Sequence, residues 1–224
     1  MLDELYHYLS SPSNRALVAD RLGEHVWLAL VPLLVGLLVA VPLGGLGQRR
    51  RTARTVLVGA ANAVYTIPSL ALFVLLPAII GTRILDPLNV VVALSLYTTA
   101  LLVRPVIDAL DAVPPHVVAA ATAMGYRPLH RFLTVELPLA VPALAAGVRV
   151  ASVSNISLVS VGALIGTGGL GVLFTDGFQR AYLAPIVVGI VLTLLLALVV
   201  DLLLVGLRRV LTPWERVSRG GGGR

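Results

Sequence analysis

The sequence contains no cysteine and no lysine, and charged and aromatic residues are scarce. Without cysteine the chain forms no disulfide, no thiolate nucleophile and no cysteine-ligated metal site. Charged residues make up 12% of the 224 positions, about half of the roughly 25% that is usual in soluble domains. Hydrophobic residues reach 58% and the mean hydropathy is +0.95, which is too apolar for one soluble core of this length. These values exclude a disordered chain, a fibrous repeat and an ordinary soluble enzyme, and they predict an integral membrane protein.

The charge that is present comes mainly from arginine. All 17 basic residues are arginines, and the formal net charge is +6. The arginines lie between long apolar runs and form no basic stripe, so we expect contacts with membrane lipid and no nucleic-acid partner. The histidines, which show no spacing typical of a metal site, are His7, His25, His116 and His130. We therefore expect no metal and no catalytic residue in this chain.

Five long runs of mostly uncharged residues meet the roughly 20-residue requirement for crossing a bilayer. These runs cover residues 26–46, 55–82, 87–103, 137–161 and 181–207. They are too long and too uniformly apolar for the strands of a membrane barrel. The sequence therefore predicts an all-α, polytopic transmembrane helical bundle of about five spans.

The distribution of arginine in the loops predicts the orientation. Twelve arginines follow the first, third and fifth runs, whereas four lie in the other connections. Because cytoplasmic loops are enriched in arginine, we expect the N-terminus outside and the C-terminus inside. This gives an extracytoplasmic or interfacial segment at 1–25, a transmembrane domain at 26–207 with a cytoplasmic loop at 104–136, and a cytoplasmic tail at 208–224.

The loop at 104–136 carries the clearest functional pattern. Pro114 and Pro115 precede a short apolar segment, and Gly125 follows it, which predicts a helix at 116–124. Its small apolar residues suit docking into a groove of a partner protein. A generic amphipathic surface helix is the alternative interpretation.

This loop resembles a known signature. Ala120-Ala121, then Gly125 after three residues, then Val135-Glu136-Leu137-Pro138 after nine more, is similar to the cytoplasmic loop of ABC-importer permeases. Ala119 stands where that family usually has an acidic residue, and Val135 replaces isoleucine. The resemblance implies that the loop couples to an ATPase through Ala119, Ala120, Ala121, Gly125, Val135, Leu137 and Pro138.

Two further stretches resemble permeases for osmoprotectants such as glycine betaine, choline and carnitine. One is Tyr65-Thr66-Ile67-Pro68-Ser69-Leu70-Ala71-Leu72, and the other is the glycine-rich segment at 163–171. The resemblance implies a five-span core of the methionine-permease type in the bacterial inner (plasma) membrane. It also implies three partners: a cytoplasmic ABC ATPase dimer that uses ATP and Mg²⁺, an extracytoplasmic substrate-binding protein, and a second permease copy or paralogue. The chain has no P-loop, so we expect it to bind no cofactor and to hydrolyse no ATP itself.

The candidate pathway residues lie in the second and fourth spans. Asn62, Tyr65, Thr66 and Ser69 are spaced to share one helical face, beside a kink at Pro68. This stripe lines a pathway or, alternatively, forms a polar packing seam.

Arg149 and Asn155 are candidates in the fourth span. Arg149 lies roughly 16 Å along the helix from Pro138, near the middle of the bilayer. A charge at that depth faces a wet pathway or pairs with backbone carbonyls or Asp201. The sequence leaves both interpretations of Arg149 open.

The segment from Gly166 to Gly171 fits the spacing G-x-G-x-x-G. That motif binds dinucleotides only inside a βαβ unit, whereas this segment follows a transmembrane helix. We expect a tight turn at the outer mouth, and the resemblance adds a contact for the binding protein at Gly166, Gly168, Gly169 and Gly171.

Together these features predict the permease subunit of an ABC importer for small zwitterions or quaternary amines, most directly osmoprotectants. An importer of another small solute such as methionine is the first alternative. A passive channel or a membrane-assembly protein without an ATPase is the alternative from a different class.

Overall fold

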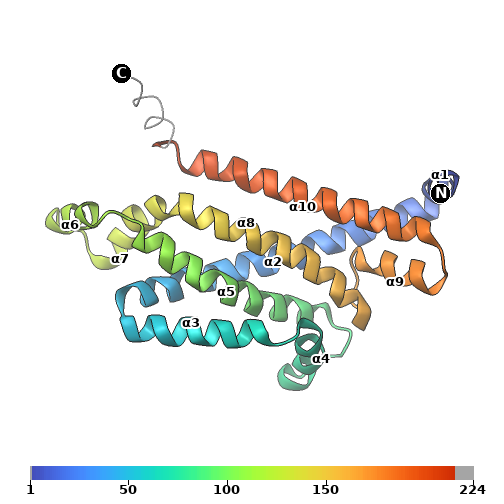
Figure 1. Cartoon of the computed structure of the whole chain (residues 1–224), viewed down its shortest axis with the longest axis horizontal. Helices are drawn as coiled ribbons and strands as arrows, with labels where there is room; N and C mark the ends of the chain where they lie inside the picture. Colours follow the sequence, from blue (N-terminus) through green and yellow to red (C-terminus); the bar gives the residue numbers. More distant parts are fainter. Residues whose placement is uncertain (1, 215–224) are drawn as a thin grey trace.

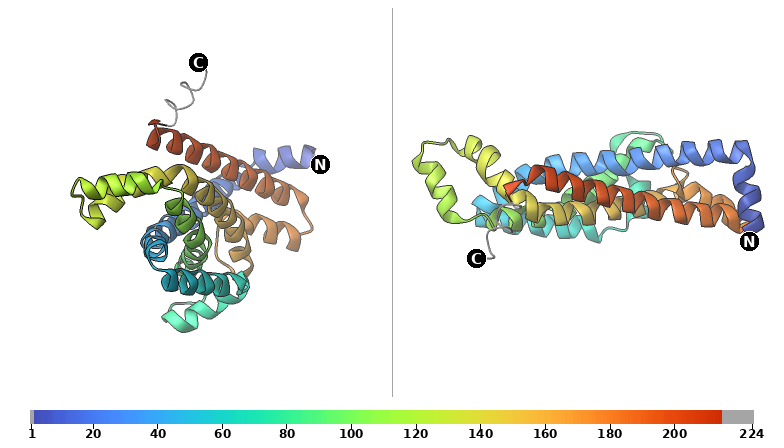
Figure 2. Two further views of the ribbon diagram at one scale, coloured as in Figure 1. Left: turned by 60° about the vertical axis from the view of Figure 1, so that its left-hand side comes forward. Right: turned by 90° about the horizontal axis from the view of Figure 1, so that it is seen from above.

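The computed structural model describes residues 2–214, and every regular element in that range is helical. The elements form a long bundle whose main helices run roughly along one axis (Figures 1 and 2). In chain order they are α1 (Leu2–Ser10), α2 (Pro12–Arg49), α3 (Arg51–Thr66), α4 (Ser69–Ile80), α5 (Pro87–Asp111), α6 (Pro115–Ala123), α7 (Pro128–Arg131), the π-helical turn η1 (Phe132–Glu136), α8 (Leu137–Gly162), the 3₁₀ turn η2 (Ala163–Ile165), α9 (Gly171–Gln179) and α10 (Leu183–Leu211). The predicted all-α bundle is confirmed.

Within the described residues, four helical stretches are long and apolar enough to cross a membrane. They are Pro12–Arg49, Pro87–Asp111, Pro128–Ile165 and Leu183–Leu211. The bent pair α3 and α4 makes a fifth span if the two helices are counted together. The predicted number of about five spans is therefore confirmed.

The second span differs from its sequence-based prediction, because residues 55–82 do not form one continuous helix. The chain bends by 101° between α3 and α4. Pro68 lacks a backbone N–H and disfavours a helical conformation at Ile67, so the helix ends there. The hydroxyl of Tyr97 on α5 donates a 2.5 Å hydrogen bond to the carbonyl of Ile67. The predicted kink is thus a break whose free carbonyl has a partner on another helix.

Helices α2 and α5 pack closely because glycines line their interface. A Cβ at Gly47 would lie 2.8 Å from Ile107, and a Cβ at Gly44 would overlap the side chain of Val106. Small residues let two backbones approach in this way inside membranes, where dispersion contacts drive helix association. Helix α10, by contrast, has many exposed apolar residues, as a lipid-facing helix requires, and Leu203 is 67% exposed.

The two ends of the bundle carry different elements (Figure 1). Helices α6 and α7 lie at one end, here called the α6 end, with the junction of α2 and α3 and the last turns of α10. Helices α1 and α9 lie at the other, here called the α9 end. At the α6 end Arg49 donates to the carbonyl of Pro128 at 3.4 Å, and Arg54 pairs with Asp111 at 2.6 Å. The arginines that follow the first and third apolar runs thus gather at one end of the molecule.

The expected segment boundaries do not coincide with helix ends. Helix α2 begins at Pro12, so residues 12–25 continue directly into the first span. Helix α5 extends to Asp111, and α10 extends to Leu211. The arginines of the tail at 216, 219 and 224 and the glycine run at 220–223 lie outside the described residues.

Candidate functional site

The loop between α5 and α8 contains the expected short helix and its glycine stop. Helix α6 covers Pro115–Ala123, and Gly125 has a φ of +84°, in the left-handed region that glycine adopts without a Cβ clash. The N–H of Tyr126 bonds to the carbonyl of Ala121 at 3.2 Å, and the N–H of Gly125 bonds to the carbonyl of Thr122 at 3.0 Å. These two bonds form a Schellman motif, which closes the helix end.

Helix α6 presents one face to the chain and leaves the other exposed. Ala121 is 2% exposed, and Val118 packs against the buried core cluster of this end. Ala119 and Ala120 are exposed, and Met124 is 69% exposed. The surface available to a partner is therefore small and apolar, and Ala121 belongs to the inner side rather than to that surface.

A single arginine links α6 to the start of α8. Arg131 donates from Nε to Oε1 of Glu136 at 2.7 Å and from Nη1 to Oγ1 of Thr122 at 2.6 Å. Glu136 is 4% exposed and ends η1, which continues directly into α8 at Leu137 and Pro138. Sequence reasoning missed this set, although Glu136 lies inside the matched signature.

Three of the six candidate pathway residues lie on α3 and a fourth, Ser69, lies on α4 beyond the 101° bend, so the four do not share one helical face as predicted. Asn62, Tyr65 and Thr66 are exposed on α3, none of whose residues is buried, and Ser69 begins α4. A hollow of about 350 Å³ lies beside this surface. Its lining includes Asn62 and the charged side chains of Arg54 and Arg104, as well as Thr55, Val58, Gly59 and Ile107.

The other two candidates lie elsewhere. Arg149 forms a bidentate ion pair with Asp201 of α10, with Nε–Oδ1 at 2.5 Å and Nη2–Oδ2 at 2.7 Å. Asn155 is 2% exposed; its Oδ1 accepts from Thr98 at 3.0 Å and its Nδ2 donates to the carbonyl of Ala29 at 3.3 Å. Asn155 thus ties three helices together inside the bundle. The six residues do not form one continuous surface in this conformation.

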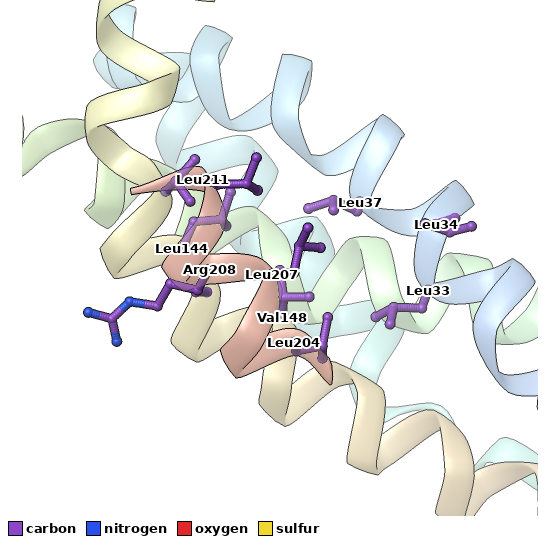
Figure 3. A pocket seen from close by; sticks show the side chains of 11 residues that line it. Leu33, Leu34, Leu37, Leu144, Val148, Leu204, Leu207, Arg208 and Leu211 are labelled. Atoms are coloured by element: carbon purple, nitrogen blue, oxygen red, sulfur yellow. The ribbon is translucent and has the colours of Figure 1, made fainter. Parts of the chain in front are cut away.

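An apolar hollow of about 190 Å³ lies between α2, α8 and α10. Leucines from all three helices and Val148 surround it, and the guanidinium of Arg208 points away from the leucines (Figure 3). Leucine and valine side chains give a zwitterion no hydrogen-bonding partner, so the desolvation cost of a charged solute would be uncompensated here. This hollow therefore does not suit a charged substrate.

The glycine-rich segment at the α9 end is held by Glu24 and His25 of the first span, two residues here called the clamp. Gly169, with a φ of +80°, donates from its N–H to Oε2 of Glu24 at 2.9 Å. The N–H of Leu170 donates to Nδ1 of His25 at 3.1 Å, and Nε2 of His25 donates to the carbonyl of Ile156 at 2.9 Å. His25 is fully buried, and with Nδ1 accepting and Nε2 donating it is in its neutral form.

The candidate contact glycines are mostly inside the protein. Gly168, Gly169 and Gly171 are buried, whereas Gly166 is exposed. A Cβ at Gly168 would overlap the carboxylate of Glu24, and a Cβ at Gly171 would lie 2.5 Å from a backbone oxygen of α8. The glycines therefore make room for the clamp. Sequence reasoning missed Glu24 and His25, which lie 145 positions from the residues that they bind.

Residues 2–214 contain no group of three or more acidic or histidine side chains that could hold a metal ion. Comparisons with known proteins identify the family of this chain.

The family described as "Binding-protein-dependent transport system inner membrane component" matches residues 32–212. The chain belongs to this family. It is therefore a membrane-spanning transport component, and its apolar helices make it a multi-pass protein of the inner membrane. As in other members of such systems, the ATPase is a separate subunit.

Curated relatives match nearly the whole chain. It is 36% identical to the osmoprotectant import permease protein OsmW of Salmonella typhimurium over 210 residues, which cover 92% of this chain and 96% of OsmW. It is 30% identical to the choline transport system permease protein OpuBB of Bacillus subtilis over 190 residues, covering 85% of this chain and 86% of OpuBB. The resemblance to osmoprotectant permeases expected from the sequence is confirmed.

A solved structure of the methionine ABC transporter MetNI contains a chain with the same fold. The TM-score is 0.78 with 22% sequence identity, and the alignment covers 90% of this chain and 99% of that chain. At this identity the match shows the fold alone. The predicted fold of the methionine-permease type is confirmed.

Proposed function

We propose that this chain is the permease subunit of an ABC importer for osmoprotectants that carry a quaternary ammonium group. The observation that carries the proposal is the 36% identity to OsmW over almost the full length of both chains. Relatives named for choline and for glycine betaine, carnitine and choline share 29–30% identity over 85% of the chain. All of these solutes carry a trimethylammonium group, which makes that group the chemical class of the substrate.

Substrate selection is assigned to a separate binding protein rather than to this chain. Quaternary ammonium groups are bound most strongly inside cages of several aromatic rings. The sequence has only twelve aromatic residues, and the face of α3 offers one such ring, Tyr65, in edge-to-face contact with Tyr97. A single pair of rings does not form such a cage, which supports a role in the passage of the solute rather than in its tight binding.

The α6 end is assigned to the cytoplasm, with the N-terminus outside and the C-terminus inside. The gathering of arginines at this end supports that orientation through the positive-inside rule. The exposed face of α6 then docks into a pair of ABC ATPase subunits, which bind ATP and Mg²⁺. Ala119 is exposed at the position where the family pattern usually has an acidic residue. The docking of α6 therefore depends on shape complementarity and apolar contact, without that acidic side chain.

The pathway is assigned to the polar face of α3 and the break before α4. Asn62, Tyr65 and Thr66 are exposed there, and a half-length helix such as α4 is tolerated at membrane depth only where it is covered by protein or water. A second permease copy or paralogue would cover this face and complete the channel. Arg149, paired with Asp201, is assigned to holding α8 against α10 rather than to the pathway.

The outer surface around the glycine-rich loop is assigned to the binding protein. Phe178 is 82% exposed and Leu164 is 64% exposed beside Gly166. A hollow of about 570 Å³ lies between them and is lined also by Arg21 and Gln179. Exposed large apolar side chains around a mixed polar hollow suit a docking surface.

Reconstitution tests this function directly. The permease, its ATPase subunits and its binding protein are placed in liposomes, and uptake of labelled glycine betaine, choline, carnitine and methionine is measured with and without ATP. We expect ATP-dependent uptake of the quaternary amines only. Uptake without ATPase subunits would indicate a passive channel, and uptake of methionine alone would overturn the substrate class.

A further inference from the structure

The guanidinium of Arg131 lies where α6, η1 and the start of α8 meet. It donates to Glu136 at 2.7 Å through Nε and to Thr122 at 2.6 Å through Nη1. The two acceptors are fourteen positions apart in the sequence, one on α6 and the other in the helical stretch Pro128–Ile165, which forms the fourth span and also contains Arg131. One rigid, planar group thus bridges the docking helix and the span.

One side of this bridge is buried and the other is exposed. Glu136 has a side-chain exposure of 5% and Arg131 of 20%, so water competes little for the ion pair, whereas the hydrogen bond to Thr122 is exposed. A buried carboxylate is costly unless it is paired, which holds Arg131 in place on Glu136. Because the guanidinium has its donors in a fixed fork, the pairing through Nε also sets the direction of the N–H groups at Nη1. Thr122 lies in that direction.

Helix α6 has few other attachments. Within residues 2–214, no other side-chain hydrogen bond joins α6 to another element; Val118 packs against the core cluster, and Ala121 is buried. The element that receives the bridge, η1, is a π-helical turn, a form that recurs at functional positions in longer helices. The hydrogen bond from Arg131 to Thr122 thus adds a side-chain link between α6 and the helical stretch Pro128–Ile165, beside the backbone connection at residues 124–127.

We infer that Arg131 is a positioning residue that transmits the movement of α6 to the fourth span through Thr122 and Glu136. The inference rests on the proposed function, because it assumes that an ATPase subunit moves α6. In this chain the bridge joins the exposed Thr122 of α6 to the buried Glu136, whereas Ala119 leaves the exposed face of α6 without an acidic group.

The test uses Thr122→Val, which removes the hydroxyl and keeps the shape of the side chain. Thr134→Val is the matched control: both hydroxyls are exposed and donate to the carbonyl four residues earlier, Thr122 at 2.8 Å and Thr134 at 2.7 Å. Thr122 alone accepts from Arg131. In proteoliposomes with the ATPase and binding-protein subunits, we expect Thr122→Val to lower uptake per ATP hydrolysed by about tenfold, as for the loss of a charged hydrogen bond. The basal ATPase rate and the amount of folded complex should match those of Thr134→Val.

A second variant separates positioning from folding. Arg131→Lys keeps a positive charge beside Glu136 but lacks the fork that reaches two acceptors, so it should fold normally and show the coupling defect of Thr122→Val. Thr122→Ser should restore coupling. Equal coupling in Thr122→Val and Thr134→Val, or a defect that follows only the amount of folded complex, would overturn the inference. If the wild type itself failed to take up any solute with ATP, the proposed function would fail first, independently of these variants.

Discussion

At the α9 end, the loop from Thr167 to Gly171 is buried, and a histidine and a glutamate of the first span bind its backbone N–H groups. At the α6 end, the docking helix projects from the bundle (Figure 1) and is attached by apolar contacts and one arginine. A Cβ at Gly168 would overlap Glu24, whereas a Cβ at Gly125 would meet no atom within 4 Å. Close packing thus requires glycine at position 168, whereas at position 125 the backbone conformation requires it.

This difference in packing indicates a different role for each end of the bundle. Segments with few buried contacts open and move at low free-energy cost, whereas tightly packed segments move with the body to which they are attached. The α9 end is therefore suited to move as a rigid unit together with α2 and α8. The α6 end is suited to be displaced by a partner. Four changes test this comparison, beginning with the largest expected effect.

The two ends should lie on opposite sides of the membrane. Because the chain has no cysteine, single cysteines can be introduced without removing native ones. Arg83 lies in the loop between α4 and α5, whose Leu85 is close to Gly166 at the α9 end, and Arg50 lies between α2 and α3 at the α6 end. In intact cells a membrane-impermeant thiol reagent should label Arg83→Cys and leave Arg50→Cys unlabelled, and permeabilised cells should label both. Labelling of position 50 in intact cells would reverse the proposed orientation and, with it, the assignment of α6 to the ATPase.

Removing the clamp at the α9 end should destabilise the whole fold. His25→Ala deletes a fully buried ring and leaves the N–H of Leu170 and the carbonyl of Ile156 without their partner. The cavity and the unpaired groups together should cost about 3–5 kcal/mol, so the midpoint of thermal unfolding in detergent should fall by several degrees and folded protein should become scarce. His7→Ala on α1, an exposed position, is the control and should behave as wild type. A His25→Ala protein of normal stability would show that the clamp is not structural.

Local sequence patterns predicted the α6 end well. The two prolines, the glycine stop and the spacing to Leu137-Pro138 are all within 25 residues, and each has a local conformational reason. The long apolar runs likewise predicted the number of spans. Pro68 predicted a disturbance in the second span but not its size of 101°, nor that Tyr97 on another helix binds the carbonyl of Ile67 at the break.

The α9 end could not be predicted in the same way. Glu24 and His25 carry no motif, and the glycines they bind follow the fourth span, so only the packing of α2 against α8 brings them together. Asn155 is a similar case: the sequence made it a pathway candidate in the fourth span, whereas Thr98 and Ala29 bind it inside the bundle. Whether a polar residue in a span is exposed or paired can be decided only when its neighbours on the other helices are known.

A change at the α6 end should alter coupling and leave stability almost unchanged. Gly125→Val meets no steric neighbour, but its φ of +84° is costly for a β-branched residue, by about 1–2 kcal/mol or more. The end of α6 should adjust locally, so ATP-driven uptake should fall severalfold while the thermal midpoint stays close to that of the wild type. Gly23→Ala, a helical position that is also free of neighbours, is the control and should keep both. A large loss of stability in Gly125→Val would show that this loop is held as firmly as the α9 end.

The smallest effect is expected between the two ends, at the break in the second span. Tyr97→Phe removes the hydroxyl that binds the carbonyl of Ile67 and keeps the ring that contacts Tyr65. The loss of one such hydrogen bond costs about 1 kcal/mol, so the break should persist and its two helices should become more mobile. We expect uptake to change by about twofold to fivefold with little loss of folded protein, and Tyr6→Phe, which is 79% exposed, to change neither. Wild-type uptake by Tyr97→Phe would show that Pro68 is sufficient to hold the break. The hydrogen bond from α5 would then make no contribution to transport along the proposed pathway face of α3.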